Sequence, residues 1–234
     1  GRVHELVEAF DRIVVSVPDL GEALPEYSLL LGATGQRMGS APARAWLGLS
    51  NTVVELVEHP QRPAAVAGLV FAGKSAAVES VALPNSLGLG LALCDGAGTA
   101  GFRREHPAAQ SPHLSVDHVV LRTGDAQGCV ALFSEQLGIR LALDKTVPEW
   151  GGRMLFFRAG KLTLEVIQSN QPAKGSDGFW GIAYYCADIE REHARLCHAG
   201  VLVSEIREGR KAGTRVATVK SHCLDIPTLL LAPV

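Results

Sequence analysis

The feature that most constrains how this chain can fold is a short pattern that occurs three times along it. An aspartate is followed 12 or 13 residues later by a glycine, at 19–32, 125–138 and 188–200, with apolar residues at helical spacing between them. Aspartate favours the start of a helix, and glycine favours the position just after its end. Segments typical of strands precede and follow each helix. The pattern predicts an internal repeat of one strand, one helix and three strands, in units of about 50–60 residues that are too small to bury both faces alone.

The segment between the first two helices is predicted to be a shortened copy of the same unit. Residues 68–71 and 87–93 have the composition of strands, but no capped helix lies between them. Residues 96–112 are small, polar and proline-containing, so we expect a linker between two halves of the chain. Pairing two units would let their sheets enclose a cavity, which is the usual form of a small-molecule site. The sequence therefore predicts an α+β fold with paired repeats.

The composition excludes several classes of partner. The chain has 234 residues, 47% of them hydrophobic, and a formal net charge of −2, so neither nucleic acid nor an anionic membrane is expected as the main partner. The longest apolar runs are too short to span a bilayer, and no secretory signal begins the sequence, so we expect a cytoplasmic protein. The five cysteines show no Cys-x-x-Cys spacing, and reduced, packed thiols are expected.

Two side chains of the third unit are candidates for chemistry. His118 lies near the start of the first strand of this unit, and Glu165 lies in its last strand. If these strands are outer strands of one curved antiparallel sheet, both side chains point into its concave face. An imidazole and a carboxylate that converge there form half of a metal shell, or an acid–base pair. A buried histidine with a hydrogen-bonded carboxylate is the structural alternative.

The order of elements resembles the vicinal oxygen chelate superfamily, which includes glyoxalases, bleomycin-resistance proteins and extradiol dioxygenases. The resemblance is carried by Val116-Asp117-His118-Val119-Val120 at the start of the third unit and Leu162-Thr163-Leu164-Glu165-Val166 at its end. It implies four βαβββ modules, the second degenerate, paired into two glyoxalase-like domains with cupped mixed sheets. The domains would span residues 1–110 and 113–234, and the second would carry the site.

In metal-using members of this superfamily, each pair of modules supplies ligands from the first and last strands of both modules. His118 and Glu165 occupy these positions in the third module, where they would hold a divalent metal (Mn, Ni, Zn, Co or Fe) and serve as the catalytic residues. The corresponding positions of the fourth module align with Gly181 and Leu230, and neither can bind a cation. His222 would supply a third ligand only if its turn folds inward.

The first module carries Arg12 and Glu55 at the ligand positions. An arginine does not ligate a metal, so we expect Arg12 to pair with Glu55. The second module offers only apolar residues. The resemblance therefore implies that the N-terminal pair has lost its chemistry and serves packing or association with another chain.

The resemblance also suggests which side chains would bind a substrate in the C-terminal cup. Trp150 would form a wall and Arg153 would bind an anion, unless 149–153 is only a glycine-rich turn. An apolar or aromatic ligand would be lined by Trp150, Phe157, Tyr185 and Leu230. The basic turn at 209–215 is expected to be a solvated hairpin tip, with an anion site as the alternative.

These residues favour a small-molecule enzyme of the glyoxalase-like type, with lyase or isomerase chemistry in which a metal stabilises an enolate-like intermediate. The alternatives are a metal-free binding protein of the resistance type and a scaffold whose cups are both vestigial. An extradiol-type dioxygenase is disfavoured, because its metal triad needs a second histidine and Gly181 cannot provide one. Members of the superfamily often pair sheets across chains, so a homodimer is an option.

Overall fold

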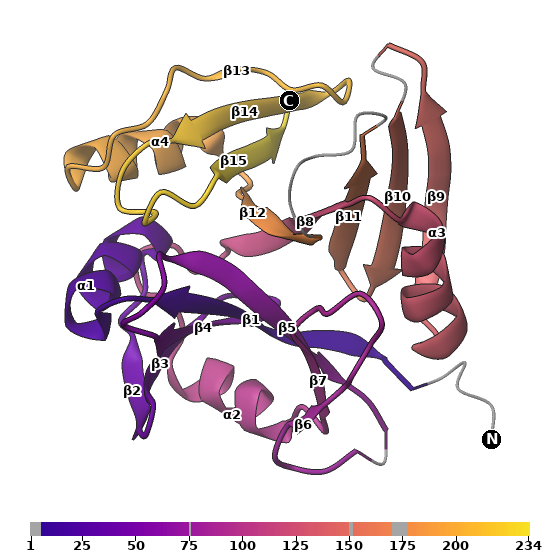
Figure 1. Cartoon of the computed structure of the whole chain (residues 1–234). Helices are drawn as coiled ribbons and strands as arrows, with labels where there is room; N and C mark the ends of the chain where they lie inside the picture. Colours follow the sequence, from indigo (N-terminus) through magenta and orange to yellow (C-terminus); the bar gives the residue numbers. More distant parts are fainter. Residues whose placement is uncertain (1–5, 75, 150–151, 170–176) are drawn as a thin grey trace.

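The chain forms two mixed β-sheets in the computed structural model, which describes residues 6–74, 76–149, 152–169 and 177–234 (Figure 1). The N-terminal sheet and its helices comprise β1 (Ala9–Val17), α1 (Leu20–Leu31), β2 (Gln36–Ser40), β3 (Ala43–Gly48), β4 (Val53–Glu58), β5 (Ala65–Ala72), β6 (Val81–Ala82), β7 (Leu91–Cys94) and α2 (Ala97–Glu105). The C-terminal sheet and its helices comprise β8 (Ser115–Thr123), α3 (Ala126–Cys129) with its π-helical continuation η1 (Val130–Gln136), β9 (Arg140–Val147), β10 (Gly152–Ala159), β11 (Leu162–Gln168), β12 (Gly178–Tyr185), α4 (Ile189–His198), β13 (Arg207–Glu208), β14 (Thr214–Val219) and β15 (Thr228–Pro233).

Each sheet joins two modules through their first strands. The strand order is β2-β3-β4-β1-β5-β7-β6 in one sheet and β13-β14-β15-β12-β8-β11-β10-β9 in the other. The first strands pair antiparallel, β1 with β5 and β8 with β12, whereas the first and last strands of one module pair parallel, as in β1 with β4. This arrangement confirms the predicted α+β fold with paired modules and two curled mixed sheets.

The repeated aspartates cap the three helices that the sequence predicted. The side chains of Asp19, Asp125 and Asp188 each accept a hydrogen bond from a backbone N–H in the first turn. Gly32 ends α1 in the left-handed conformation, with φ of 62°, which glycine adopts without steric cost. These helix boundaries follow from local sequence alone.

One continuous hydrophobic core extends across both sheets. It contains the apolar side chains that α1, η1 and α4 share with the faces of the strands they cover, and its largest fully buried members are Tyr27, Tyr184, Phe71, Phe133 and Phe157. We call the opposite face of each sheet, turned away from α1, α3 and α4, the cup face. In Figure 1, α3 and α4 lie on the outside of the two halves of the C-terminal sheet.

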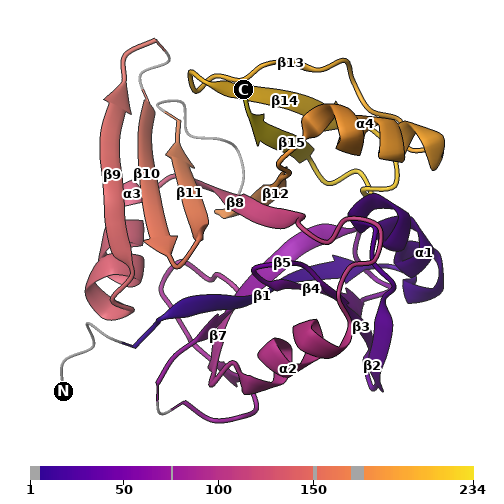
Figure 2. The same cartoon turned by 180° about the vertical axis from the view of Figure 1, so that it is seen from behind.

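The segment predicted as a linker contains a helix. It does connect the two sheets, but its first half forms α2, which lies beneath the N-terminal sheet on the side away from the C-terminal sheet (Figure 2). Gly96 stands at the N-cap of this helix and has no side chain, and the carboxylate of Asp95, one residue earlier, accepts a hydrogen bond from the N–H of Ala97. No helix in the described part of the chain is long and apolar enough to cross a membrane.

Candidate functional site

His118 and Glu165 meet on the cup face of the C-terminal sheet. Their strands, β8 and β11, are parallel neighbours in the middle of the sheet, so the prediction that they are outer strands of an antiparallel sheet is wrong. His118 stands opposite Thr163 and Glu165 stands opposite Val120, which places the two side chains diagonally on one face. The Nε2 atom of His118 is 3.3 Å from Oε2 of Glu165, and each side chain is 16% exposed. The pair is therefore close together and accessible from solvent.

Asp117 completes this group, and it was not among the functional residues predicted from the sequence. In the pairing of β8 with β12, His118 faces Ala183 and Val116 faces Tyr184, so Asp117 is the extra residue of a β-bulge. Its Oδ2 atom lies 2.7 Å from Nδ1 of His118. An ionised carboxylate only accepts hydrogen bonds, so Nδ1 carries the proton and Nε2 faces Glu165. The signal was present in the sequence as an aspartate directly before the histidine.

The surroundings of His118 favour its charged form. Burial of the imidazole acts to lower the pKa of His118, but the hydrogen bond with Asp117 and the negative charges of Glu165 and Asp117 outweigh it. The pKa of His118 therefore lies above its usual value. An imidazolium between two carboxylates can donate a proton or a hydrogen bond from Nε2 to a substrate oxygen.

Strand register defines the rest of the cup face around Glu165. Three neighbouring strands, β10, β11 and β8, place nine side chains in three rows: Arg158, Thr163 and His118; Phe156, Glu165 and Val120; Met154, Ile167 and Arg122. Glu165 therefore has apolar neighbours on both sides. Arg158 stands at the β10 end of the first row, and Arg122 stands at the β8 end of the third row.

Two predicted substrate-binding residues lie on the opposite face of β10. Phe157 is fully buried and packs on the ring of Phe133, with centroids 5.3 Å apart, so Phe156 is the aromatic residue that β10 places on the cup face. Arg153 forms a salt bridge with Asp144, 2.7 Å between Nη2 and Oδ2, and reaches Gln127 on α3. Side chains alternate along a strand, so an error of one residue moves a side chain to the other face.

The fourth module was predicted to place Gly181 at the position of His118, which is correct, and Leu230 at the position of Glu165, which is wrong. Asp117 and Trp180 are the bulged residues of β8 and β12, so Gly181 does occupy the position of His118. A Cβ atom at Gly181 would lie 2.6 Å from the carbonyl oxygen of Pro227, so the close backbone requires glycine. The pairing of Ala183 with Leu229 corresponds to that of Val120 with Glu165, and Leu229, not Leu230, is the counterpart of Glu165.

The other residues predicted to bind a substrate do not all lie on the cup face. Leu230 is 2% exposed and belongs to the core, so it does not line the cup. Tyr185 is two residues after Ala183 on the cup face of β12 and is half-buried. Trp150 lies outside the described residues. The basic turn at 209–215 connects β13 to β14 and is largely exposed, as expected of a hairpin tip.

The pair can hold part of a metal shell. Two ligand atoms 3.3 Å apart, each about 2.0–2.1 Å from one ion, subtend roughly 100–110° at it, which suits two adjacent ligands. Among the described residues, however, no group of three or more His, Cys, Asp or Glu side chains could hold a metal. The protein therefore supplies two ligands here, and water or substrate oxygens would have to complete the shell.

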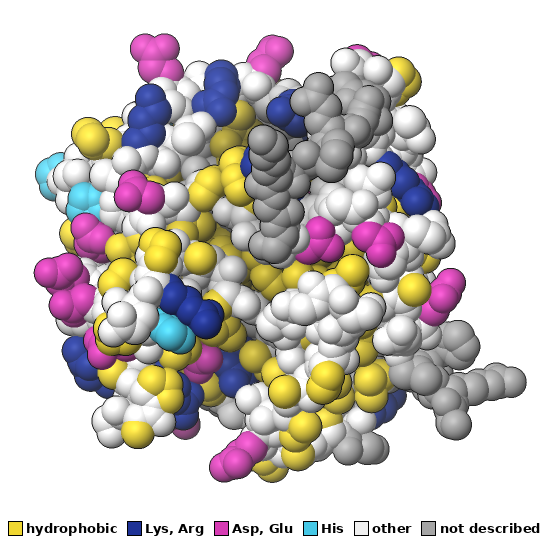
Figure 3. Space-filling view, in the orientation of Figure 1, with side chains coloured by type: hydrophobic (Ala, Val, Ile, Leu, Met, Phe, Trp, Pro, Cys, Tyr) yellow, Lys and Arg dark blue, Asp and Glu magenta, His cyan; other side chains and the backbone are white. Residues whose placement is uncertain are grey.

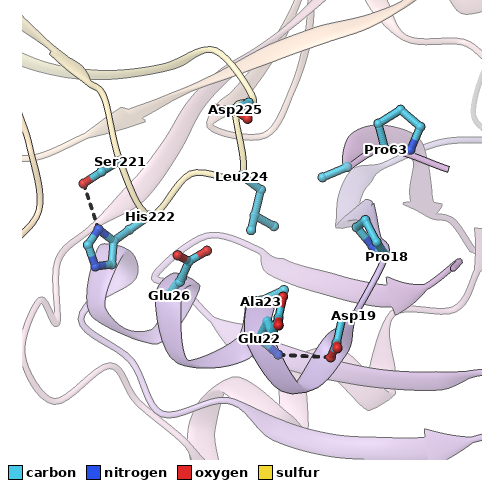
Figure 4. Close-up of a pocket in the computed structure, with 11 residues that line it drawn as sticks. Pro18, Asp19, Glu22, Ala23, Glu26, Pro63, Ser221, His222, Leu224 and Asp225 are labelled. Carbon is cyan, nitrogen blue, oxygen red and sulfur yellow. Dashed lines mark hydrogen bonds between the residues drawn. The ribbon is translucent and has the colours of Figure 1, made fainter.

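His222 does not turn toward this site. It lies in a cleft of about 720 Å³ between α1 and the loop at 221–225, where its Nδ1 atom is 2.8 Å from Oγ of Ser221 (Figure 4). Carboxylates line this cleft, including Asp19, Glu26 and Asp225, and neither His118 nor Glu165 does. The condition under which His222 would supply a third ligand, a turn folded inward, is therefore not met.

The N-terminal sheet carries the same arrangement with an arginine in place of the histidine. Arg12 bonds Asp11, 2.6 Å between Nη1 and Oδ2, and its Nε atom lies 3.5 Å from Oε2 of Glu55, which confirms the predicted pair. Trp46 occupies the position of Phe156 and donates its indole N–H to Glu55 at 2.5 Å. The guanidinium thus occupies the position where a cation would be bound.

Helix α2 covers this second cup. Phe102 packs edge-on against Trp46 with ring centroids 5.4 Å apart, and the hydroxyl of Thr99 donates to Asp11. Phe102 is 7% exposed and Glu55 is 5% exposed. The chain therefore fills its own N-terminal cup with these side chains.

The similarity of this chain to known proteins agrees with this geometry. The model of the Glyoxalase/Bleomycin resistance protein/Dioxygenase superfamily matches residues 117–218. A mutant of 4-hydroxymandelate synthase from Streptomyces coelicolor superposes with a TM-score of 0.72 at 14% identity, over 97% of this chain and 93% of that chain. A xylose isomerase-like TIM barrel/4-hydroxyphenylpyruvate dioxygenase fusion protein has a TM-score of 0.72 at 15% identity, over 99% of this chain and 50% of that chain.

A shorter match is methylmalonyl-CoA epimerase from Mycobacterium tuberculosis, with a TM-score of 0.43 at 17% identity, over 51% of this chain and 87% of that chain. No curated protein matches the sequence. At these identities the two structures with a TM-score of 0.72 show a shared fold and leave the reaction open. Residues 117–218 thus match the model of the glyoxalase/bleomycin resistance/dioxygenase superfamily, and the fold is shared along nearly the whole length of the chain.

Proposed function

We propose that the protein is a small-molecule enzyme that transfers a proton on its substrate at the cup face of the C-terminal sheet, in lyase or isomerase chemistry. The observation that carries the proposal is the accessible group of Asp117, His118 and Glu165, with 3.3 Å between Nε2 and Oε2. Hydrophobic side chains reach the surface between the β10–β11 and β14–β15 parts of this sheet (Figure 3), as suits an organic substrate.

In this proposal, each residue of the group has one task. Glu165 accepts a proton on Oε2 from a carbon next to a substrate carbonyl. His118 donates a hydrogen bond from Nε2 to the carbonyl oxygen, where negative charge develops as the proton leaves. Asp117 keeps the proton on Nδ1 of His118 and holds the ring in position. Phe156 and Val120 place apolar surface on both sides of Glu165.

A divalent metal would be held by the same two atoms, Nε2 of His118 and Oε2 of Glu165. When bound, it would polarise a substrate oxygen as a Lewis acid. Asp117 would then orient the ligating imidazole, as carboxylates commonly do for metal-bound histidines. The raised pKa of His118 means that a proton competes with the cation for Nε2.

Exchange of a substrate C–H proton with solvent tests the proposal. The protein is incubated in D₂O with a panel of 2-oxo acids, 2-oxo aldehydes and thioesters, and deuterium incorporation is followed by NMR. We expect exchange that Glu165→Gln abolishes and that Glu190→Gln, an exposed change on α4, leaves intact. Exchange at the wild-type rate in Glu165→Gln would refute the assignment.

A binding protein of the resistance type is the second candidate. The cup face offers apolar side chains to a ligand, namely Val120, Met154, Phe156 and Ile167. Ligand binding without any exchange, unaffected by Glu165→Gln, would favour this function. An extradiol-type dioxygenase stays disfavoured, since Gly181 and Leu229 stand at the ligand positions of the fourth module.

We also infer that the chain divides into domains at 1–110 and 113–234. The hydrogen-bonded sheet changes between β7 and β8, which supports this boundary.

A further inference from the structure

Two arginines face each other at the outer edge of the C-terminal cup face. Arg140 on β9 and Arg158 on β10 are directly opposite in the antiparallel register, and both are exposed. Like charges in this position destabilise a sheet. Among the described residues, neither guanidinium has a carboxylate partner, and Arg158 reaches only the hydroxyl of Thr163, at 3.5 Å. Arg153 on the same strand, by contrast, is fully paired with Asp144.

This cationic pair belongs to the same row of side chains as His118. The row runs from Arg140 through Arg158 and Thr163 to His118, one residue on each of four neighbouring strands. Strands lie about 4.7–4.9 Å apart, so the backbones of Arg158 and His118 are about 10 Å apart. A small molecule can span this distance and contact both side chains.

The filled N-terminal cup shows what occupies the position that is equivalent to that of Arg158. The residue of that sheet that corresponds to Arg158 is Gly48, because Gly48 pairs with Val53 and Val53 pairs with Arg12. A Cβ atom at Gly48 would lie 3.4 Å from the ring of Phe102 and 3.3 Å from the carbonyl oxygen of His106. Helix α2 and the residue after it therefore cover that position. In the described part of the C-terminal domain no helix covers Arg158, and the small residue is replaced by a cation.

We propose that the ligand of the C-terminal cup is an organic anion whose carboxylate or phosphate group is bound by Arg158 and Arg140. The planar fork of an arginine matches either group, and an anion between the two guanidiniums relieves their repulsion. The apolar body of the ligand lies over Phe156, which is beside Arg158 on the same face. This inference rests on the proposed function for the place of the reacting carbon, at Glu165.

The other cations of this face are Arg122 and Lys145, and Lys145 stands opposite Met154 with no cation directly across from it. The guanidinium of Arg122 stacks on the ring of Trp180, 4.1 Å from its centroid. A cation held in this way has part of its surface covered and has no like charge opposite it. The anion is therefore assigned to the row of Arg158 and not to the row of Arg122.

Two fluorescent dyes that differ in one charged group test the assignment. 8-Anilinonaphthalene-1-sulfonate is an aromatic anion, and N-phenyl-1-naphthylamine is the same ring system without the sulfonate. We expect Arg158→Gln to weaken binding of the anionic dye at least about fivefold and to leave binding of the neutral dye within about twofold. Arg140→Gln should act in the same direction, and Arg153→Gln, on the opposite face, should change neither dye.

Three results would overturn the proposal. The first is that the wild type binds the anionic dye no better than the neutral dye. The second is that Arg158→Gln binds the anionic dye as tightly as the wild type does. The third is that only Arg122→Gln weakens binding of the anionic dye. Raising the salt concentration should weaken binding of the anionic dye to the wild type and have little effect on its binding to Arg158→Gln. Glu165→Gln should keep the anionic dye while losing deuterium exchange, so failure of the anion site and failure of the proton transfer are separate outcomes.

Discussion

Removing the side chain that seals the N-terminal cup should destabilise the protein without affecting the C-terminal site. Phe102 is 7% exposed and belongs to a small cluster with Trp46 and Val53, which Met38 contacts from the side. Replacing a buried Phe by Ala costs about 3–5 kcal/mol, depending on how far the site can collapse. The cluster lies at the surface and can relax, so we expect Phe102→Ala to lower the free energy of unfolding by about 3 kcal/mol.

For a chain of this length, that loss corresponds to a decrease in melting temperature of about 6–12 °C. Urea denaturation gives the free energy and differential scanning calorimetry the temperature. Phe156→Ala is the matched control, because Phe156 has the position of Trp46 in the C-terminal sheet and no described helix covers it. Phe156→Ala should lower the free energy of unfolding by less than half as much as Phe102→Ala does. A change below about 1 kcal/mol in Phe102→Ala would refute the view that α2 is packed as part of the fold, and a loss of deuterium exchange would refute the independence of the two cups.

Four further changes test separate parts of the site. Asp117→Asn should lower the pKa of His118, measured by NMR of the imidazole, because the charged hydrogen-bond partner is lost; an unchanged pKa would show that Asp117 does not hold the ring. Since the pKa of His118 is raised in the folded state, its contribution to stability is fully present below the unfolded pKa of about 6.5 and is lost as the pH rises through the folded pKa. Urea denaturation of the wild type and His118→Gln at pH 5 and pH 9 should therefore differ more at the lower pH, and an equal difference at both would contradict the shift. Glu165→Gln should abolish any binding of Mn, Ni, Zn, Co or Fe seen in the wild type, measured by calorimetry, whereas Glu190→Gln should bind as the wild type does. Gly181→Ala should destabilise the fold by about 1–3 kcal/mol, since its Cβ would lie 2.6 Å from a backbone oxygen, and a neutral result would show that β12 and the residue before β15 can move apart.

The clearest errors of the sequence analysis are errors of one residue. Phe157 was predicted to line the cup in place of Phe156, and Leu230 in place of Leu229. Both segments are nearly continuous apolar runs, so hydrophobicity does not indicate which of two adjacent side chains faces the helices. Register depends on how neighbouring strands hydrogen-bond, and a shift of one residue reverses the face of every side chain.

Local sequence by itself determined α1, α3 and α4 and the unit that repeats, because an aspartate cap and a left-handed glycine act within one turn of the chain. It also identified His118 and Glu165, and the pairing of Arg12 with Glu55, through the equivalence of the repeated units. Only the tertiary structure decided which strands are neighbours and that a bulge turns Asp117 toward His118. It also decided that α2 covers one cup, while the other is bordered by two arginines that have no carboxylate partner among the described residues. These features depend on contacts between segments that are distant in sequence, whose free energy exists only once the sheets have formed.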